Sequence, residues 1–206
     1  MKAGPERVAS AEEVSLRGPL RMVVGLFVLF SIYAVVRYHL AKDIAWDHFP
    51  AYVLNKSISW TGLVLIGMSR VSRVKATRSF YGLSGLAFVG LHVPLSLATL
   101  TPFYHERLFL AQGGLAWNAQ LALLAGACGV IAVMGLYTAY VRKSSAGLPL
   151  VPHLGRVAVL LGVIHVAAIG FPTWLKPGDW YWGLPPITLL SVLMGLVFLF
   201  LPVRRA

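Results

Sequence analysis

Long apolar runs separated by short polar segments dominate the pattern of this chain. Six of these runs are long enough to cross a membrane as helices, because a hydrocarbon core of about 30 Å needs roughly 20 helical residues. We predict membrane-spanning helices over residues 19–40, 52–70, 80–101, 115–141, 151–174 and 183–203. The second run is the least apolar, since Asn55, Lys56, Ser57 and Ser59 make its first turns polar. The predicted fold is therefore all-α, a polytopic membrane protein built as a six-helix bundle.

The chain is interpreted as one domain, because no internal repeat and no low-complexity linker interrupts the pattern. Residues 1–18 form a polar N-terminal tail, and residues 19–203 hold the six-helix domain. The first apolar run is expected to be retained rather than cleaved as a signal peptide. Its tail carries Glu6, Glu12 and Glu13, and no small-residue cleavage site follows it.

Composition supports a lipid environment. The 206 residues are 58% hydrophobic and only 12% charged, whereas soluble domains carry about 25% charged residues. The net charge of +11 would suit nucleic acid if the basic residues formed a continuous stripe. They lie instead in short segments between apolar runs, so we expect membrane lipid and not nucleic acid as the partner. The single cysteine, Cys128, excludes an intramolecular disulfide.

The basic residues divide unequally between the two predicted faces of the membrane. Thirteen lie on one face: Lys2, Arg7, Arg17, Arg21, Arg70, Arg73, Lys75, Arg78, Arg142, Lys143, Arg156, Arg204 and Arg205. Five lie on the other: Arg37, Lys42, Lys56, Arg107 and Lys176. Because Lys and Arg accumulate in cytoplasmic segments, we predict an inner-membrane protein with both termini in the cytoplasm.

Three of the six histidines fall inside predicted spans. His39, His48 and His105 lie at helix ends or in outer loops and are expected to be ordinary surface residues. His92, His153 and His165 lie within apolar runs. An ionisable side chain at membrane depth is costly, so it indicates a functional site by default.

His92 and His165 are predicted to lie at the same depth. Each lies nine residues before the outer end of its span, roughly 14 Å below that interface at 1.5 Å per residue. Neutral imidazoles are common metal ligands, and bundles build cofactor sites from facing helices. A haem iron bound by one histidine from each helix fits this arrangement, as do two histidines hydrogen-bonded across helices. Small residues that leave room for a flat macrocycle are Gly82, Gly85, Gly90, Gly162, Ala167 and Ala168.

Two segments resemble a known family. The first, Ile58–Leu97, has a glycine-containing helix, a basic run from Arg70 to Arg78, and a second helix from Gly82 to His92. The second is PHLGRVAVLLGVIHVAAIGFPTW, which ends at Trp174. Both are similar to segments of the ferric-reductase-like transmembrane domain family, which includes the haem-binding membrane subunit of the periplasmic methionine sulfoxide reductase system.

The resemblance implies a cofactor and its ligands. In that family, mid-helix histidines of the third and fifth helices bind a b-type haem, which implies His92 and His165 as the iron ligands. Members with a second haem use another pair, for which His153 is the candidate here. Its expected partner position falls at Arg78 or Ser79, which are not ordinary haem ligands. Arg156 and Arg78 could pair with haem propionates, or they could simply lie at the cytoplasmic interface.

The expected function is electron transfer across the membrane, with no catalytic residue of the chain's own. No glycine-rich dinucleotide-binding motif is present, so the electron donor is expected to be a separate flavin reductase, a bound FMN or FAD, or quinol. The acceptor implied by the resemblance is a periplasmic redox protein, such as a molybdenum-dependent methionine sulfoxide reductase, or ferric iron. The competing interpretation is a cofactor-free transporter or structural subunit, which predicts charged or broken helices at the midplane.

Overall fold

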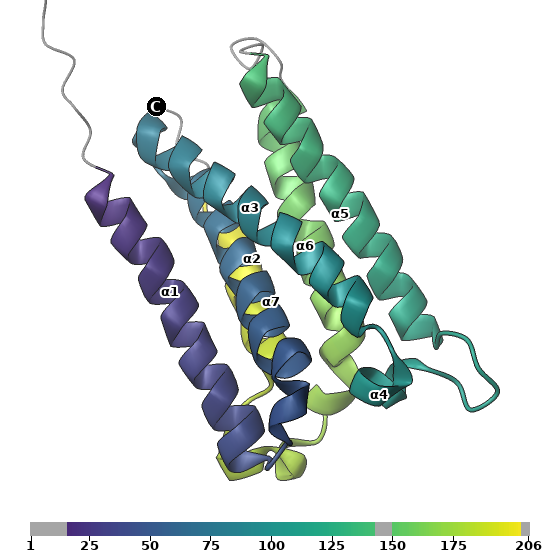
Figure 1. The fold of residues 1–206 in the computed structure, drawn as a ribbon. Helices are drawn as coiled ribbons and strands as arrows, with labels where there is room; N and C mark the ends of the chain where they lie inside the picture. The colour runs from purple at the N-terminus through teal and green to yellow at the C-terminus, as the bar shows by residue number, and fades with distance from the viewer. Residues whose placement is uncertain (1–15, 143–149, 203–206) are drawn as a thin grey trace, which may run out of the picture.

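The computed structural model describes residues 16–142 and 150–202, and these residues form an all-helical bundle without a β-strand (Figure 1). The all-α prediction is therefore confirmed. The rest of the predicted N-terminal tail, residues 1–15, lies outside the described part. The longer helices are α1 (Arg17–Val35), α2 (Asn55–Val71), α3 (Lys75–Thr99), α5 (Trp117–Val141), α6 (Leu150–Trp174) and α7 (Ile187–Phe200).

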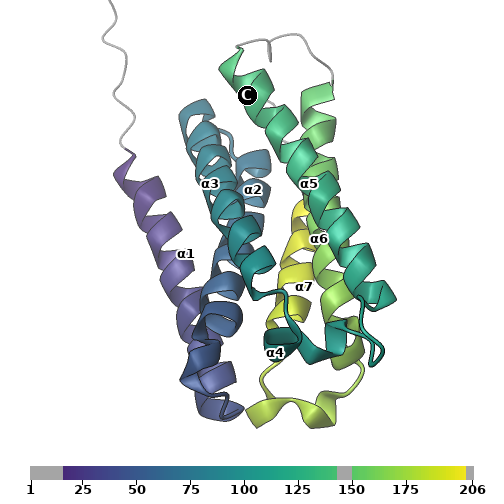
Figure 2. The ribbon, with the colours of Figure 1, turned by 45° about the vertical axis from the view of Figure 1, so that its right-hand side comes forward.

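Short helical turns connect these helices at one end of the bundle. They are Val36–Ala41, Trp46–His48, Pro50–Leu54, α4 (Pro102–His105), Glu106–Leu108, Pro177–Asp179 and Tyr181–Gly183. The long helices run alternately up and down, so the start of α1 and the end of α7 lie at the opposite end (Figures 1 and 2).

Five helical segments of the described chain are long and apolar enough to cross a membrane. They are Arg17–Ala41, Lys75–Thr99, Trp117–Val141, His153–Trp174 and Tyr181–Phe200. Large apolar side chains face outward on these helices, including Leu29, Ile131 and Phe200, which are 59%, 71% and 84% exposed. An apolar exterior of this kind is compatible with a multi-pass membrane protein.

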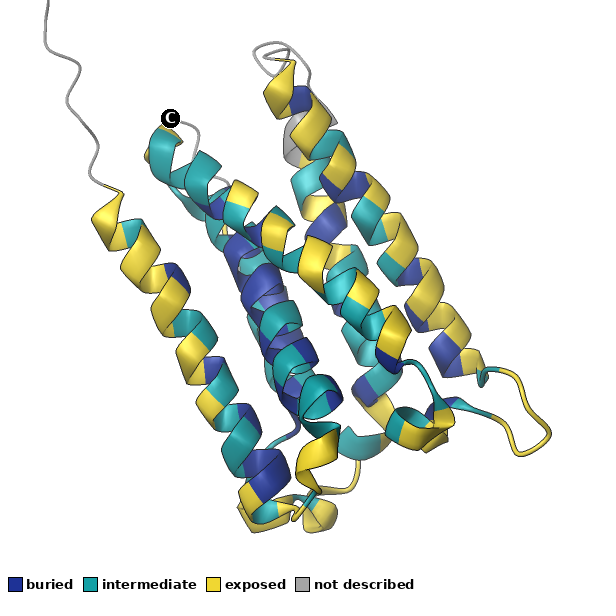
Figure 3. Cartoon of the chain, viewed as in Figure 1, coloured by how far each residue is buried: buried dark blue, intermediate teal, exposed yellow. Residues whose placement is uncertain are grey.

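Helix α2 is the central helix, and it differs from the other five. It packs against α1, α3, α6 and α7, and Figure 3 shows buried residues concentrated along the middle of the bundle while α1 carries many exposed ones. The polar side chains of Ser57 and Thr61 are fully buried, and Thr61 donates a hydrogen bond of 2.7 Å to the Ser57 carbonyl. Because α2 faces protein on most sides, it need not be as apolar as a lipid-facing helix.

Aromatic stacking and one close approach hold α2 to its neighbours. The ring of Trp60 stacks on Phe30 of α1, with centroids 3.9 Å apart. Near the other end of α2, a Cβ at Gly67 would lie 2.3 Å from the ring of Phe198 on α7. Only a residue without a side chain lets α7 pack this closely.

The last predicted span begins later than expected. Helix α7 starts at Ile187 rather than at residue 183, because Pro185 and Pro186 precede it and disfavour helix at and before themselves. A tight turn over Tyr181–Gly183 comes first, in which Trp182 adopts the left-handed conformation with φ 51°.

Candidate functional site: a histidine pair between α3 and α6

The imidazole rings of His92 on α3 and His165 on α6 lie against each other. Their centroids are 6.0 Å apart, and their planes are nearly perpendicular at 84°. The two residues are 73 positions apart in sequence, and the fold brings together the two rings that were predicted to lie level on parallel helices.

Helix α5 orients the ring of His165. Its Nδ1 lies 2.7 Å from the carbonyl oxygen of Ala122. Since a carbonyl oxygen can only accept, Nδ1 carries the hydrogen, and in the neutral ring Nε2 keeps its lone pair. One turn later on α5, a Cβ at Gly126 would lie 2.9 Å from His165 Nδ1. Gly126 therefore provides the space in which this hydrogen bond forms.

Helix α2 orients the ring of His92 in the same way. Its Nδ1 lies 2.7 Å from Oδ1 of Asn55, so the amide oxygen accepts from the ring. Ser96, one turn after His92, completes a small network: its Oγ lies 3.0 Å from Nδ2 of Asn55 and 3.3 Å from Nε2 of His92. Asn55 is buried, and its polar side chain is thereby satisfied.

This hydrogen bonding is the arrangement expected of metal-binding histidines. Such residues donate one ring N–H to an acceptor, which fixes the tautomer and turns the other nitrogen toward the metal. A metal bonded at about 2 Å to one nitrogen of each ring separates the ring centroids by roughly 6 Å, which agrees with the observed separation. Within residues 16–142 and 150–202, no group of three or more His, Cys, Asp or Glu side chains is placed to bind a metal ion. The pair is thus a two-ligand set, which fits haem.

The glycines predicted to make room for a macrocycle mostly serve helix packing. A Cβ at Gly82, Gly85 or Gly162 would lie within 3.0 Å of a side chain of α2. These three positions let α3 and α6 approach α2. Gly90 differs, because a Cβ there would have no neighbour within 4 Å.

The other predicted site residues lie away from the pair. His153 and Arg156 are exposed on α6, and His153 precedes His165 by 12 residues, or roughly 18 Å of helix. Arg78 lies at the same end of the bundle and donates hydrogen bonds of 2.8 and 3.1 Å to the Ser72 carbonyl. A second haem with His153 as ligand stays a prediction, as do the propionate contacts of Arg78 and Arg156.

The surface prediction for the remaining histidines is wrong for His39. This ring is 5% exposed, stacks on Trp46 with centroids 4.2 Å apart, and is bonded through Nδ1 to the Ile44 carbonyl. His48 stacks on Phe103 at 4.6 Å. Burial, together with the nearby cations Lys56 and Arg107, lowers the pKa of His105 to about 4.

Sequence reasoning missed Asn55, Ser96 and Gly126 as supports of the pair. The signal for Asn55 is its position in an apolar run, because a polar residue there indicates an internal partner. The chain matches no protein-family model and no curated protein with which it was compared.

Proposed function

We propose that this chain is a six-span inner-membrane protein that binds haem b between His92 and His165 and carries electrons across the membrane. The observation that supports this most strongly is the facing pair of rings, 6.0 Å apart, each with Nδ1 bonded to an acceptor. When bound, haem would supply four equatorial nitrogens and one-electron iron chemistry.

The chain's own residues hold and orient the two ligands. Asn55 and the Ala122 carbonyl keep the Nδ1 hydrogens in place, which makes Nε2 the nitrogen that would bind iron and increases its basicity. The Ser96 hydroxyl, 3.3 Å from Nε2 of His92, donates its hydrogen to Oδ1 of Asn55 at 3.1 Å and leaves that nitrogen available. The surrounding apolar helices exclude water and lower the local dielectric, two of the levers by which a protein tunes a haem potential.

Helix α2 is proposed as the sixth span. Together with the turn Pro50–Leu54 it covers 22 residues, or roughly 33 Å at the α-helical rise, enough for a hydrocarbon core. The excess of basic residues at the end of the bundle that holds the start of α1 supports a cytoplasmic position for both termini. Electrons would enter from a flavin reductase, a bound FMN or FAD, or quinol, and would leave to a periplasmic redox protein or ferric iron.

The reduced-minus-oxidised absorption spectrum of the purified full chain tests this proposal. We expect a b-type haem signal, and we expect His92→Ala and His165→Ala each to abolish the same signal, because each removes one iron ligand. His153→Ala is the matched control, since it removes an exposed histidine from the same helix as His165. It should leave that signal intact, and any partial loss would indicate a second haem. A colourless preparation from haem-replete cells would support the cofactor-free alternative instead.

A further inference from the structure

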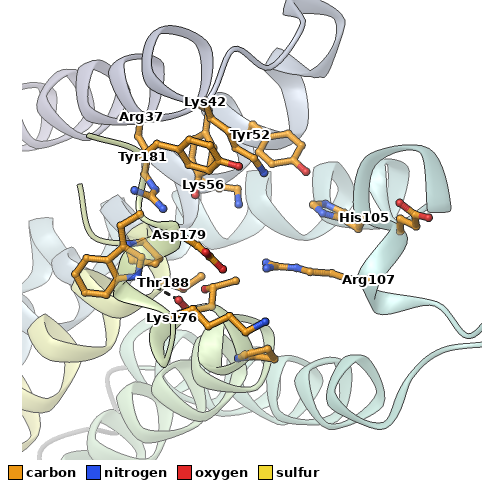
Figure 4. Close-up of a pocket in the computed structure, with 16 residues that line it drawn as sticks. Arg37, Lys42, Tyr52, Lys56, His105, Arg107, Lys176, Asp179, Tyr181 and Thr188 are labelled. Atoms are coloured by element: carbon orange, nitrogen blue, oxygen red, sulfur yellow. Dashed lines mark hydrogen bonds between the residues drawn. The ribbon is translucent and has the colours of Figure 1, made fainter. Parts of the chain in front are cut away.

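Five basic side chains from distant parts of the chain line one cavity of about 410 Å³ at the end of the bundle where the short turns lie. They are the five that the sequence assigned to the outer face: Arg37, Lys42, Lys56, Arg107 and Lys176. Figure 4 shows Arg107, Lys56 and Lys176 directed toward the space that they enclose. A cavity of this size can hold a small-molecule ligand.

The positive charge of this outer basic pocket is not neutralised by the protein. Two carboxylates, Glu106 and Asp179, also line it, which leaves a net charge of five minus two, or +3. Neither forms an ion pair with a lining cation; the described residues contain one ion pair, between His48 and Asp47. Gathering like charges in a partly buried space is unfavourable unless an opposite charge joins them.

Aromatic rings hold two of the lysines in place without neutralising them. Nζ of Lys56 lies 4.6 Å from the ring centre of Tyr38 and 4.8 Å from that of Tyr52. Nζ of Lys42 lies over Tyr181 at 5.5 Å. Cation–π contacts stabilise an ammonium group and leave its N–H donors available.

Arg37 adds a buried donor to the pocket. Its side chain is 6% exposed, and its Nη1 donates to the Leu184 carbonyl, while its Nε is buried without a partner. The segment that carries Arg107 is held to the bundle by the Tyr52 hydroxyl, which donates to the Tyr104 carbonyl at 3.1 Å. The cations are therefore positioned by the fold, which favours a built site over a chance surface cluster.

We infer that the outer basic pocket binds a small oxyanion carrying at least two negative charges on carboxylate, phosphate or sulfate groups. Five converging basic donors match such a ligand, and the formal net charge of +3 would be offset by it. The pocket lies toward the same end of the bundle as the histidine pair: Lys56 follows Asn55, and Thr173 lies eight residues, or roughly 12 Å, beyond His165 on α6. The anion site does not depend on the proposed haem.

Calorimetric titration of the full chain with citrate and with sulfate, in a lipid-free non-ionic detergent, tests this inference. We expect saturable binding that weakens as the salt concentration rises. Arg107→Gln and Lys176→Gln alter exposed residues and should each weaken binding about tenfold through one lost charged contact. Asp179→Asn should tighten it, because it removes a competing carboxylate.

Arg73→Gln is the control, since it removes one positive charge from an exposed position outside the pocket. An equal weakening by Arg73→Gln, or the absence of saturable binding, would overturn the inference. So would binding confined to haem-free protein, because the haem propionates would then be the occupants. Nanodiscs distinguish two sources of the anion: competition by cardiolipin, whose two phosphodiesters carry two negative charges, but not by phosphatidylcholine identifies a lipid phosphate, and no competition identifies a soluble ligand. Haem loading is read separately from the absorption spectrum.

Discussion

The histidine pair and the outer basic pocket differ in how their polar groups are satisfied. At the pair, each imidazole has an acceptor on a neighbouring helix, Asn55 for His92 and the Ala122 carbonyl for His165. At the pocket, five cations share two carboxylates and form no ion pair with them. Polar groups among apolar helices have to be satisfied by other groups of the protein. Polar groups at the end of a bundle can instead be satisfied by a ligand from solution.

The largest effect at the histidine pair is expected from displacing the His165 ring. Gly126→Ala would place a Cβ 2.9 Å from His165 Nδ1 and displace the ring. We expect the haem content to fall by about tenfold or more, as when a ligand loses its orienting partner. Absorbance per mole of protein measures this. Gly129→Ala, on the same helix, is the matched control because its Cβ would only touch Leu161 at 3.6 Å; equal losses in both variants would refute the role of Gly126.

Removing the acceptor of His92 should have a somewhat smaller effect. Asn55→Ala leaves Nδ1 without the 2.7 Å partner that fixes its tautomer, so we expect haem affinity to fall about tenfold. Asn55→Asp keeps an acceptor and should retain haem with a lowered reduction potential, measured by redox titration. Ser96→Ala should cost less than Asn55→Ala, and a reversal of that order would contradict the assigned hydrogen bonding.

Protonation of His105 should strengthen anion binding in the outer basic pocket. In the free chain, burial and the cations Lys56 and Arg107 hold the pKa of His105 near 4, so the ring is neutral at pH 7. A bound anion favours the charged form and raises this pKa. Binding then takes up a proton, and affinity should increase as the pH falls from 7 to 5, on the order of threefold.

Sulfate is the probe for this experiment, because its charge is constant over that pH range. His105→Gln should reduce the dependence while leaving binding at pH 7 nearly unchanged. An affinity that falls with decreasing pH in the unmodified chain would show that the sign is wrong. His48 also acts on His105. His48→Gln is therefore the control variant, and the pH dependence of binding should persist in it.

The helices were predictable because apolar runs of this length have few alternatives. The pairing of His92 with His165 was predictable too, since depth along two parallel helices follows from residue counts. Gly126 was not, because nothing local shows which face of α5 meets His165. The outer basic pocket was hidden for a similar reason. The sequence grouped its five cations together, but their convergence depends on how the segments that follow α1, α4 and α6 fold over the end of the bundle beside α2.

The hydrogen bond from the Tyr33 hydroxyl to the Pro185 carbonyl, 2.6 Å long, joins the first long helix to the segment just before the last. The nearby bond from Arg37 to the Leu184 carbonyl does the same. A ribosome delivers these partners about 150 residues apart, or roughly ten seconds at typical synthesis rates. Until residues 184 and 185 have been synthesised, α1 cannot form these two hydrogen bonds, so its last turns are completed only at the end of synthesis.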